Sequence, residues 1–206
     1  MKKFYFLVLV VALCLGVGSV LSYGSSGNTW TDSASGLTWQ VKPAYHESVT
    51  ISSLSLMTIP AMLFGLPSSM YWKSAQSYCK DLSLDGFSDW HLPTISELRT
   101  LIRSCPATET GGACQVTHWC SSNNDCWWTN CYGCSRKKGP GRNKNYLPRA
   151  IRSFAADTYW SSTTDSDHGV WIIGVDRGAI TLQGSDSRLP HHVRCVRSEV
   201  MATQGN

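Results

Sequence analysis

Apolar residues recur with the period of an α-helix in two short stretches of the chain. In residues 68–82 they lie at offsets 0, 4, 7, 8 and 11, which is one face of a helix. These positions are Tyr71, Ala75, Tyr78, Cys79 and Leu82. Ser68 or Ser69 can cap the start. We therefore predict a helix here, with Cys79 on its buried face.

The second helical stretch follows Pro93, which holds Leu92 in an extended conformation. Thr94 and Glu97 have the spacing of a capping box, in which each side chain bonds the backbone N–H of the other residue. The apolar face that follows consists of Leu98, Leu101 and Ile102. A helix is therefore predicted to begin at this box.

The triplet Asp89-Trp90-His91 stands just before that helix and is predicted to form a corner of the fold. Trp90 would anchor the corner in the core, and Asp89 would bond backbone in a turn. An Asp near a His is weak support for catalysis when no further catalytic group accompanies it. We interpret the triplet as structural.

Alternating apolar and polar residues, typical of strands, mark the rest of the predicted secondary structure. Leu37 and Trp39 alternate with polar neighbours in a short strand at 37–40. The turn Asp176-Arg177-Gly178 predicts a hairpin, because Gly suits the bend. The other predicted strands are 157–163, 169–175, 179–183 and 191–197.

The two ends of the chain differ in composition from its middle. Residues 1–23 have two lysines, an apolar run and then small residues, which predicts a cleaved secretory signal peptide; a retained membrane anchor is the alternative. Residues 24–198 have the size of one domain. Within it, residues 48–67 are expected to form a partly buried loop, or else a binding or membrane-touching loop. Residues 199–206 are expected to be a disordered tail.

Nine cysteines point to an exported, disulfide-bonded protein, since one leaves with the signal and an even number remains. Eight cysteines allow about a hundred pairings, so spacing alone does not give the connectivity. Six of them fall in a loop-rich insert, residues 103–157. The eight are Cys79, Cys105, Cys114, Cys120, Cys126, Cys131, Cys134 and Cys195.

Several motifs occur in one order along the chain and together resemble a known bacterial family. They are SGLTWQ at 35–40, SAQSYCKDL at 74–82, GFSDWHLPTISEL at 86–98, YWSST at 159–163 and VRCVR at 193–197. This series resembles the Lcl C-terminal domain family, a domain of unknown function, and the insert resembles that of its cysteine-rich subgroup. The similarity covers most of residues 30–198.

The resemblance implies an α+β fold related to the C-type lectin-like and formylglycine-generating-enzyme-like folds, with two helices packed on small antiparallel sheets. It implies a disulfide between Cys79 and Cys195, with the other six cysteines pairing inside the insert. It also implies an exported adhesion or ligand-binding protein. Residues of these motifs expected to have structural roles are Trp39, Asp89, Trp90, Pro93, Thr94, Glu97, Trp160 and Arg194.

His91 departs from the family's pattern, which has Arg at this position of its DWRLP motif. Neutral histidine makes fewer hydrogen bonds than arginine and loses its charge near neutral pH. We interpret His91 as a local variation, with a pH-sensitive contact as the alternative.

The insert has an unbalanced charge. The chain carries a formal charge of +4, yet no acidic residue lies between Asp125 and Asp157. That span holds Arg136, Lys137, Lys138, Arg142, Lys144, Arg149 and Arg152. A basic loop of this kind favours polyanions, and in an exported protein these are sulphated or acidic glycans, lipopolysaccharide or extracellular DNA.

Three tryptophans, Trp119, Trp127 and Trp128, stand beside the cations, and their rings can stack on sugars or bases. We expect ligand contacts from the seven cations and from Trp127 and Trp128. The alternative is that the tryptophans only cover disulfides and the cations only solvate a loop.

Metal and thiol chemistry are the remaining alternatives. Cys131-Tyr-Gly-Cys134 has redox-motif spacing, and Cys126, Cys131, Cys134 and His118 are conceivable zinc ligands. Residues 121–125 and Asp165 with Asp167 offer oxygen ligands for calcium, without the spacing of an EF-hand. No phosphate-binding or hydrolase motif is present. We predict a non-enzymatic binding or adhesion module without cofactor or metal; a structural or partner-binding envelope protein is the alternative, and a thiol or metal enzyme is the second.

Overall fold

The computed structural model describes residues 27–44, 70–151 and 158–198 of the chain. The predictions for the signal peptide at 1–23, the apolar loop at 48–67, Arg152 and the tail at 199–206 lie outside these residues. No helix among the described residues is long and apolar enough to cross a membrane.

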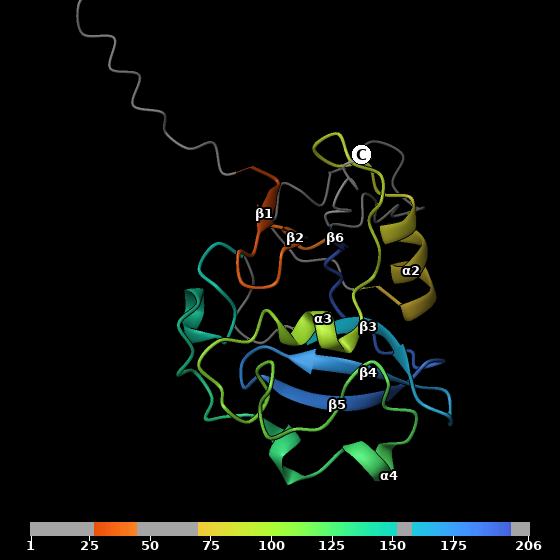
Figure 1. The fold of residues 1–206 in the computed structure, drawn as a ribbon. Coiled ribbons are helices and arrows are strands. Elements are labelled where there is room, and N and C mark those ends of the chain that lie inside the picture. Colours follow the sequence, from red (N-terminus) through yellow and green to blue (C-terminus); the bar gives the residue numbers. More distant parts are fainter. Residues whose placement is uncertain (1–26, 45–69, 152–157, 199–206) are drawn as a thin grey trace, which may run out of the picture.

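Two three-stranded antiparallel sheets form the framework (Figure 1). The first has the order β1 (Thr29–Thr31), β2 (Leu37–Gln40) and β6 (Val196–Ser198). The second has the order β3 (Thr158–Thr164), β4 (Gly169–Gly174) and β5 (Ala179–Gly184). This confirms the α+β class and the hairpin predicted at residues 176–178, where Gly178 has a φ of 67°.

The helices are short, and all of those in the described residues lie between β2 and β3 in the sequence. They are α2 (Trp72–Lys80), α3 (Ile95–Arg99) and α4 (Asn123–Cys126), followed by the 3-10 turns η2 (Thr129–Tyr132) and η3 (Arg142–Lys144). The last three elements belong to the insert. The loop-rich character predicted for the insert is therefore confirmed for its described part.

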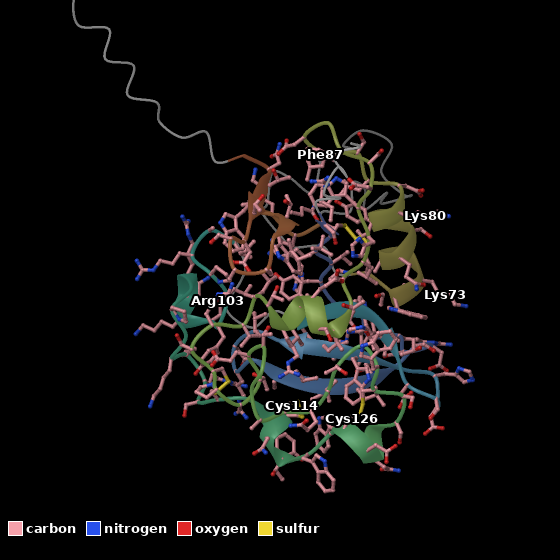
Figure 2. All side chains as sticks on the ribbon, viewed as in Figure 1. Lys73, Lys80, Phe87, Arg103, Cys114 and Cys126 are labelled. Atoms are coloured by element: carbon pink, nitrogen blue, oxygen red, sulfur yellow. A yellow bond between two sulfur atoms is a disulfide. The ribbon has the colours of Figure 1, made fainter. Side chains whose placement is uncertain are left out.

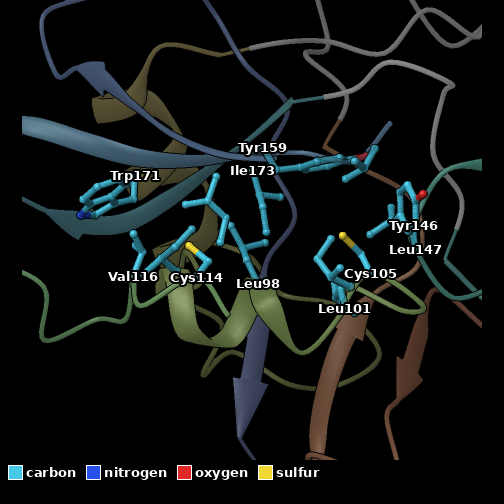
Figure 3. Packing of buried hydrophobic residues seen from close by; sticks show 14 of the residues in the cluster. Leu98, Leu101, Cys105, Cys114, Val116, Tyr146, Leu147, Tyr159, Trp171 and Ile173 are labelled. Atoms are coloured by element: carbon cyan, nitrogen blue, oxygen red, sulfur yellow. The ribbon is translucent and has the colours of Figure 1, made fainter. Parts of the chain in front are cut away.

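Strand β4 is buried on both of its faces and divides the core. Trp171 and Ile173 pack with Leu98 of α3 in one cluster, part of which Figure 3 shows. Their neighbours Val170 and Ile172 join Ala75 and Cys79 of α2 in the other cluster. Since successive side chains of a strand point to opposite faces, α2 and α3 cover opposite sides of this sheet.

Helix α2 differs from the prediction at its start. It begins at Trp72, and its N-cap is Tyr71, whose side chain forms no capping hydrogen bond, so the predicted cap by Ser68 or Ser69 is wrong. Tyr71 is also exposed rather than buried. Ala75 and Cys79 are buried as expected, and Cys79 is joined to Cys195 with a Cα–Cα distance of 5.4 Å.

Helix α3 begins at the predicted capping box. The N–H of Glu97 donates to Thr94 Oγ1 at 3.2 Å, and the N–H of Thr94 donates to Glu97 Oε2 at 2.7 Å. Just before the box, Trp90 is buried, and its indole N–H donates to the Phe87 carbonyl at 3.1 Å. The residues 89–91 thus form the predicted corner.

The partner of Asp89 is a correction to the sequence prediction. Asp89 Oδ1 accepts a hydrogen bond from Arg197 Nε at 2.7 Å, so the carboxylate chiefly holds an arginine of the last strand rather than a turn. The Arg197 guanidinium also lies 3.8 Å from the centroid of the Phe87 ring. The last predicted strand is shorter than expected: His191 and His192 form isolated bridges, and only Val196–Ser198 is a strand.

A buried arginine joins the two sheets. Arg194 donates to the carbonyls of Gln40, the last residue of β2, and of Val41, and to the hydroxyl of Tyr159 in β3 at 3.2 Å. Nearby, the N–H of Cys195 donates to Gln40 Oε1 at 3.2 Å. The structural role expected for Arg194 is therefore that of a bridge between the sheets.

A second buried arginine holds the first part of the insert. Arg99, at the end of α3, donates to the carbonyls of Thr108, Glu109 and Val116 at 2.9, 2.8 and 2.6 Å. Burial lowers the pKa of this guanidinium, but arginine remains charged in proteins. Three loop carbonyls that lie outside any sheet are thus satisfied by one side chain.

His91 is held by the helix that follows it. Its Nε2 lies 3.1 Å from Glu97 Oε1, and its side chain is 42% exposed. The hydrogen bond to Glu97 raises the pKa of His91 against the effect of burial. Burial disfavours the ionised form of Glu97, but the hydrogen bonds from His91 and Thr94 outweigh it and lower the pKa of that carboxyl. The pH-sensitive contact is thus the reading that the geometry favours.

This pair predicts a pH dependence of stability. The pKa of His91 is raised in the folded state. Its contribution to the free energy of unfolding is therefore complete below its ordinary pKa of 6.5 and is lost as the pH rises through its pKa in the folded state. The contribution of Glu97 is complete above 4.5 and lost as the pH falls. As the pH rises from about 5.5 to 8, the free energy of unfolding of the wild type should fall by up to about 1 kcal/mol relative to that of His91→Arg, because arginine keeps its charge.

Urea unfolding of both proteins across that pH range measures the difference. Asp89 and Arg197 also face this corner and are unchanged in the variant. His191 is unchanged too; burial, and to a lesser degree the charge of His192, lowers its pKa. The effects of these groups on the pH dependence of stability therefore cancel when the two proteins are compared. Identical pH profiles of the two proteins would contradict the assigned role of His91.

A second prediction concerns Arg99. Replacing it by Met takes the guanidinium donor from the carbonyls of Thr108 and Val116, while the Glu109 carbonyl keeps the N–H of Gly112 at 2.8 Å. The free energy of unfolding should fall by about 3 kcal/mol. Arg188→Met, at an exposed position, is the matched control and should change it by less than about 0.5 kcal/mol. Chemical denaturation of the oxidised proteins measures both, and equal stabilities would refute the role of Arg99.

Candidate ligand-binding surface

The basic part of the insert lies along the turn between β4 and β5. The N–H of Cys134 donates to the Arg177 carbonyl at 2.8 Å, and the N–H of Lys137 donates to the Asp176 carbonyl at 3.3 Å. On the return path, the N–H of Tyr146 donates to the Val175 carbonyl at 2.8 Å. Residues 134–149, here called the basic loop, are therefore fixed to the end of a sheet.

Inside the basic loop the backbone is closely packed around Asn145. The N–H groups of Gly139 and Gly141 donate to the carbonyls of Lys144 and Asn145, each at 3.0 Å. A Cβ atom on either glycine would overlap Asn145. Lys144 has a φ of 58°, a conformation that non-glycine residues rarely adopt. The loop therefore has a defined shape that directs its long side chains outward.

The cations of the basic loop differ in their partners. Arg136 Nε forms an ion pair with Asp176 Oδ2 at 2.9 Å. Arg149 Nε donates to the Pro140 carbonyl at 3.2 Å. Four exposed cations form no ion pair within the described part of the chain: Lys137, Lys138, Arg142 and Lys144. Most of the charge of this loop is thus available to a ligand.

One cation of this surface, Arg177, is not among the ligand-binding residues predicted from the sequence. It belongs to the tip of the β4–β5 hairpin and is exposed. Its backbone carbonyl accepts from Cys134, which places the residue beside the start of the basic loop. The predicted turn at residues 176–178 was the only signal, since nothing in the sequence shows which loop lies against that turn.

The three tryptophans of the insert occupy two kinds of environment. Trp127 is half-buried: its indole N–H donates to the Ile180 carbonyl at 2.7 Å, and its ring meets Tyr132 edge-on at 5.0 Å. Trp127 therefore helps to hold the backbone beneath this surface, and the ligand contact expected of it stays a prediction. Trp128 and Trp119 are exposed.

The disulfides determine what the cysteines of the insert are available for. Cys131 and Cys134 do not pair with each other, because their partners are Cys114 and Cys105. Cys120 pairs with Cys126. His118, the fourth ligand considered for zinc, forms a hydrogen bond between its Nδ1 and Ser96 Oγ at 2.9 Å. Among the described residues, no three potential ligands from His, Cys, Asp or Glu lie together as a metal site.

The oxygen ligands considered for calcium have a turn-forming role. Asp165 is buried, and its Oδ1 accepts from the N–H groups of Asp167 and Gly169 at 3.1 and 2.6 Å. Residues 121–125, the other segment considered for calcium, are connected to the same turn through the backbone, since the N–H of Ser166 donates to the Ser121 carbonyl at 2.8 Å. These contacts shape the connection between β3 and β4.

Comparison with known proteins identifies the family. No curated protein and no solved structure is significantly similar to the chain. A family model described as the Lcl C-terminal domain matches residues 28–197, which is most of the chain. That span contains both sheets, the helices and the basic loop, except for the last residue of β6. The chain therefore belongs to the Lcl C-terminal domain family.

Proposed function

We propose that this domain is an exported, non-enzymatic binding module that attaches to an anionic polymer through the basic loop. The observation that carries the proposal is a set of four exposed cations on a backbone of defined shape, none of which forms an ion pair with another described residue. Arginine and lysine in such a setting bind sulphate, carboxylate or phosphate groups. Sulphated or acidic glycans, lipopolysaccharide and extracellular DNA all present such groups.

Export is supported by the disulfides. The structure contains four of them, and disulfides of this density are typical of proteins that fold in an oxidising compartment. A C-type lectin-like relationship belongs to the same proposal and rests on the family resemblance. The thiol-enzyme alternative has less support, because both cysteines of the Cys131–Cys134 motif are oxidised with other partners.

Retention on a heparin column across a salt gradient tests the proposal. The test variant replaces Lys138 and Arg142 by Ser, and Lys137 and Lys144 by Asn, which tolerates the positive φ at these two positions. At about 0.5 kcal/mol for each exposed ionic contact, losing four should weaken binding roughly 30-fold at low salt. Retention should fall with added salt in the wild type.

A control variant removes the same number of charges elsewhere, at Lys42, Lys73, Lys80 and Arg188, all exposed. Figure 2 shows Lys73 and Lys80 on the helix α2, away from the segment of η3. The control should elute close to the wild type. If both variants elute together, retention reflects overall charge, and a structural or protein-partner role is favoured.

A further inference from the structure

Two successive segments of the cysteine-rich insert differ in charge. The basic loop, residues 134–149, holds six cations and no carboxylate. The preceding part, residues 115–132, here called the aromatic lobe, has Asp125 as its one formally charged residue. A polyanion bound along the basic loop gains no cation from this lobe and meets one carboxylate there. The lobe therefore suits a different ligand.

Large aromatic side chains are exposed on the aromatic lobe. Trp119 is 82% exposed, Trp128 59% and Tyr132 54%. Exposed large apolar side chains grouped on one part of a protein mark interaction sites, whereas single ones need no explanation. Figure 1 shows α4 of this lobe at the end of the molecule away from β1, and Figure 2 labels Cys114 and Cys126 there.

The exposed rings stand on a fixed backbone. Trp119 follows His118, whose N–H donates to Ser96 Oγ at 2.9 Å and whose ring lies 4.3 Å from the Trp119 ring. Trp128 follows Trp127, which is anchored to the Ile180 carbonyl. The disulfide between Cys120 and Cys126, with Cα atoms 6.0 Å apart, brings the two segments together. Little conformational entropy would be lost when a ligand settles on them.

The aromatic lobe also exposes uncharged polar side chains. The exposed ones are Gln115, Ser121, Asn124, Thr129 and Asn130. Amide and hydroxyl groups both donate and accept hydrogen bonds, as do the hydroxyl groups of sugars. The C–H groups on one face of a pyranose ring carry partial positive charge and suit the negative face of an aromatic ring.

We propose that the aromatic lobe is a second binding site, for an uncharged pyranose glycan that stacks on Trp119 and Trp128. The exposed amide and hydroxyl side chains of the same lobe would orient the sugar hydroxyls. An anionic lipid surface fits less well, because the lobe contains no Lys or Arg. The site is independent of the anionic ligand assigned to the basic loop.

Affinity electrophoresis in non-denaturing gels tests this proposal with the oxidised domain. The gels contain dextran, laminarin, galactomannan or no polymer, and a parallel gel contains dextran sulfate. We expect at least one uncharged polymer to slow the wild type, with no effect of added salt. Trp119→Ala and Trp128→Ala should each weaken this retardation roughly tenfold. Tyr71→Ala, which removes an exposed aromatic ring on α2, should leave it unchanged.

The basic-loop variant separates the two proposals. It should keep the retardation by the uncharged polymer and lose the salt-sensitive retardation by dextran sulfate, while the tryptophan variants do the reverse. Absence of retardation by every uncharged polymer overturns the aromatic site and leaves the basic loop untouched. Equal retardation of wild type and both tryptophan variants also overturns it, as does binding to zwitterionic lipid vesicles without binding to any glycan.

Discussion

Long stretches of the described residues lie outside helices and sheets, so their buried carbonyl groups need other hydrogen-bond donors, and two buried arginines supply several of these. Arg194 donates to backbone at the end of β2 and reaches Tyr159 of the other sheet, so the two sheets are connected through one guanidinium. Arg99 serves three carbonyls of the insert in the same way. Unpaired carbonyls in the interior would each cost about 1–3 kcal/mol.

The β4–β5 hairpin supports both parts of the insert. Carbonyls of Val175, Asp176 and Arg177 accept hydrogen bonds from the basic loop. The carbonyl of Ile180, on β5, accepts from Trp127 at the base of the aromatic lobe. The two proposed sites are thus held by the same hairpin yet differ in charge. Binding one long polymer across both would require alternating charged and uncharged regions in that polymer.

Local features of the fold could be predicted from the sequence. The Thr94–Glu97 capping box and the Gly178 hairpin each depend on residues within a few positions of one another, and both are present. The pairing of Cys79 with Cys195 followed from family resemblance and not from spacing. Tyr71 has the periodicity of a buried residue, but the helix begins one residue later and leaves it exposed.

Contacts between distant segments could not be predicted in the same way. Asp89 and Arg197 are 108 positions apart, so a carboxylate typical of a turn could not be matched to its real partner. The sequence predicts only a turn at Arg177. The segment that lies against this turn begins at Cys134, and its position depends on the disulfide to Cys105. The basic residues themselves are visible in the sequence. Only the structure shows that Arg136 pairs with Asp176, whereas Lys137, Lys138, Arg142 and Lys144 form no ion pair with the described residues.

The three disulfides of the insert are concentric along the chain: Cys120–Cys126 lies inside Cys114–Cys131, which lies inside Cys105–Cys134. Because each disulfide lies entirely inside the next along the sequence, each can form whether the other two are reduced or oxidised. Oxidative maturation can then proceed outward from the shortest loop without breaking a bond already formed. The longer closure between Cys79 and Cys195, 116 residues apart, must wait until the C-terminal end of the domain has been synthesised.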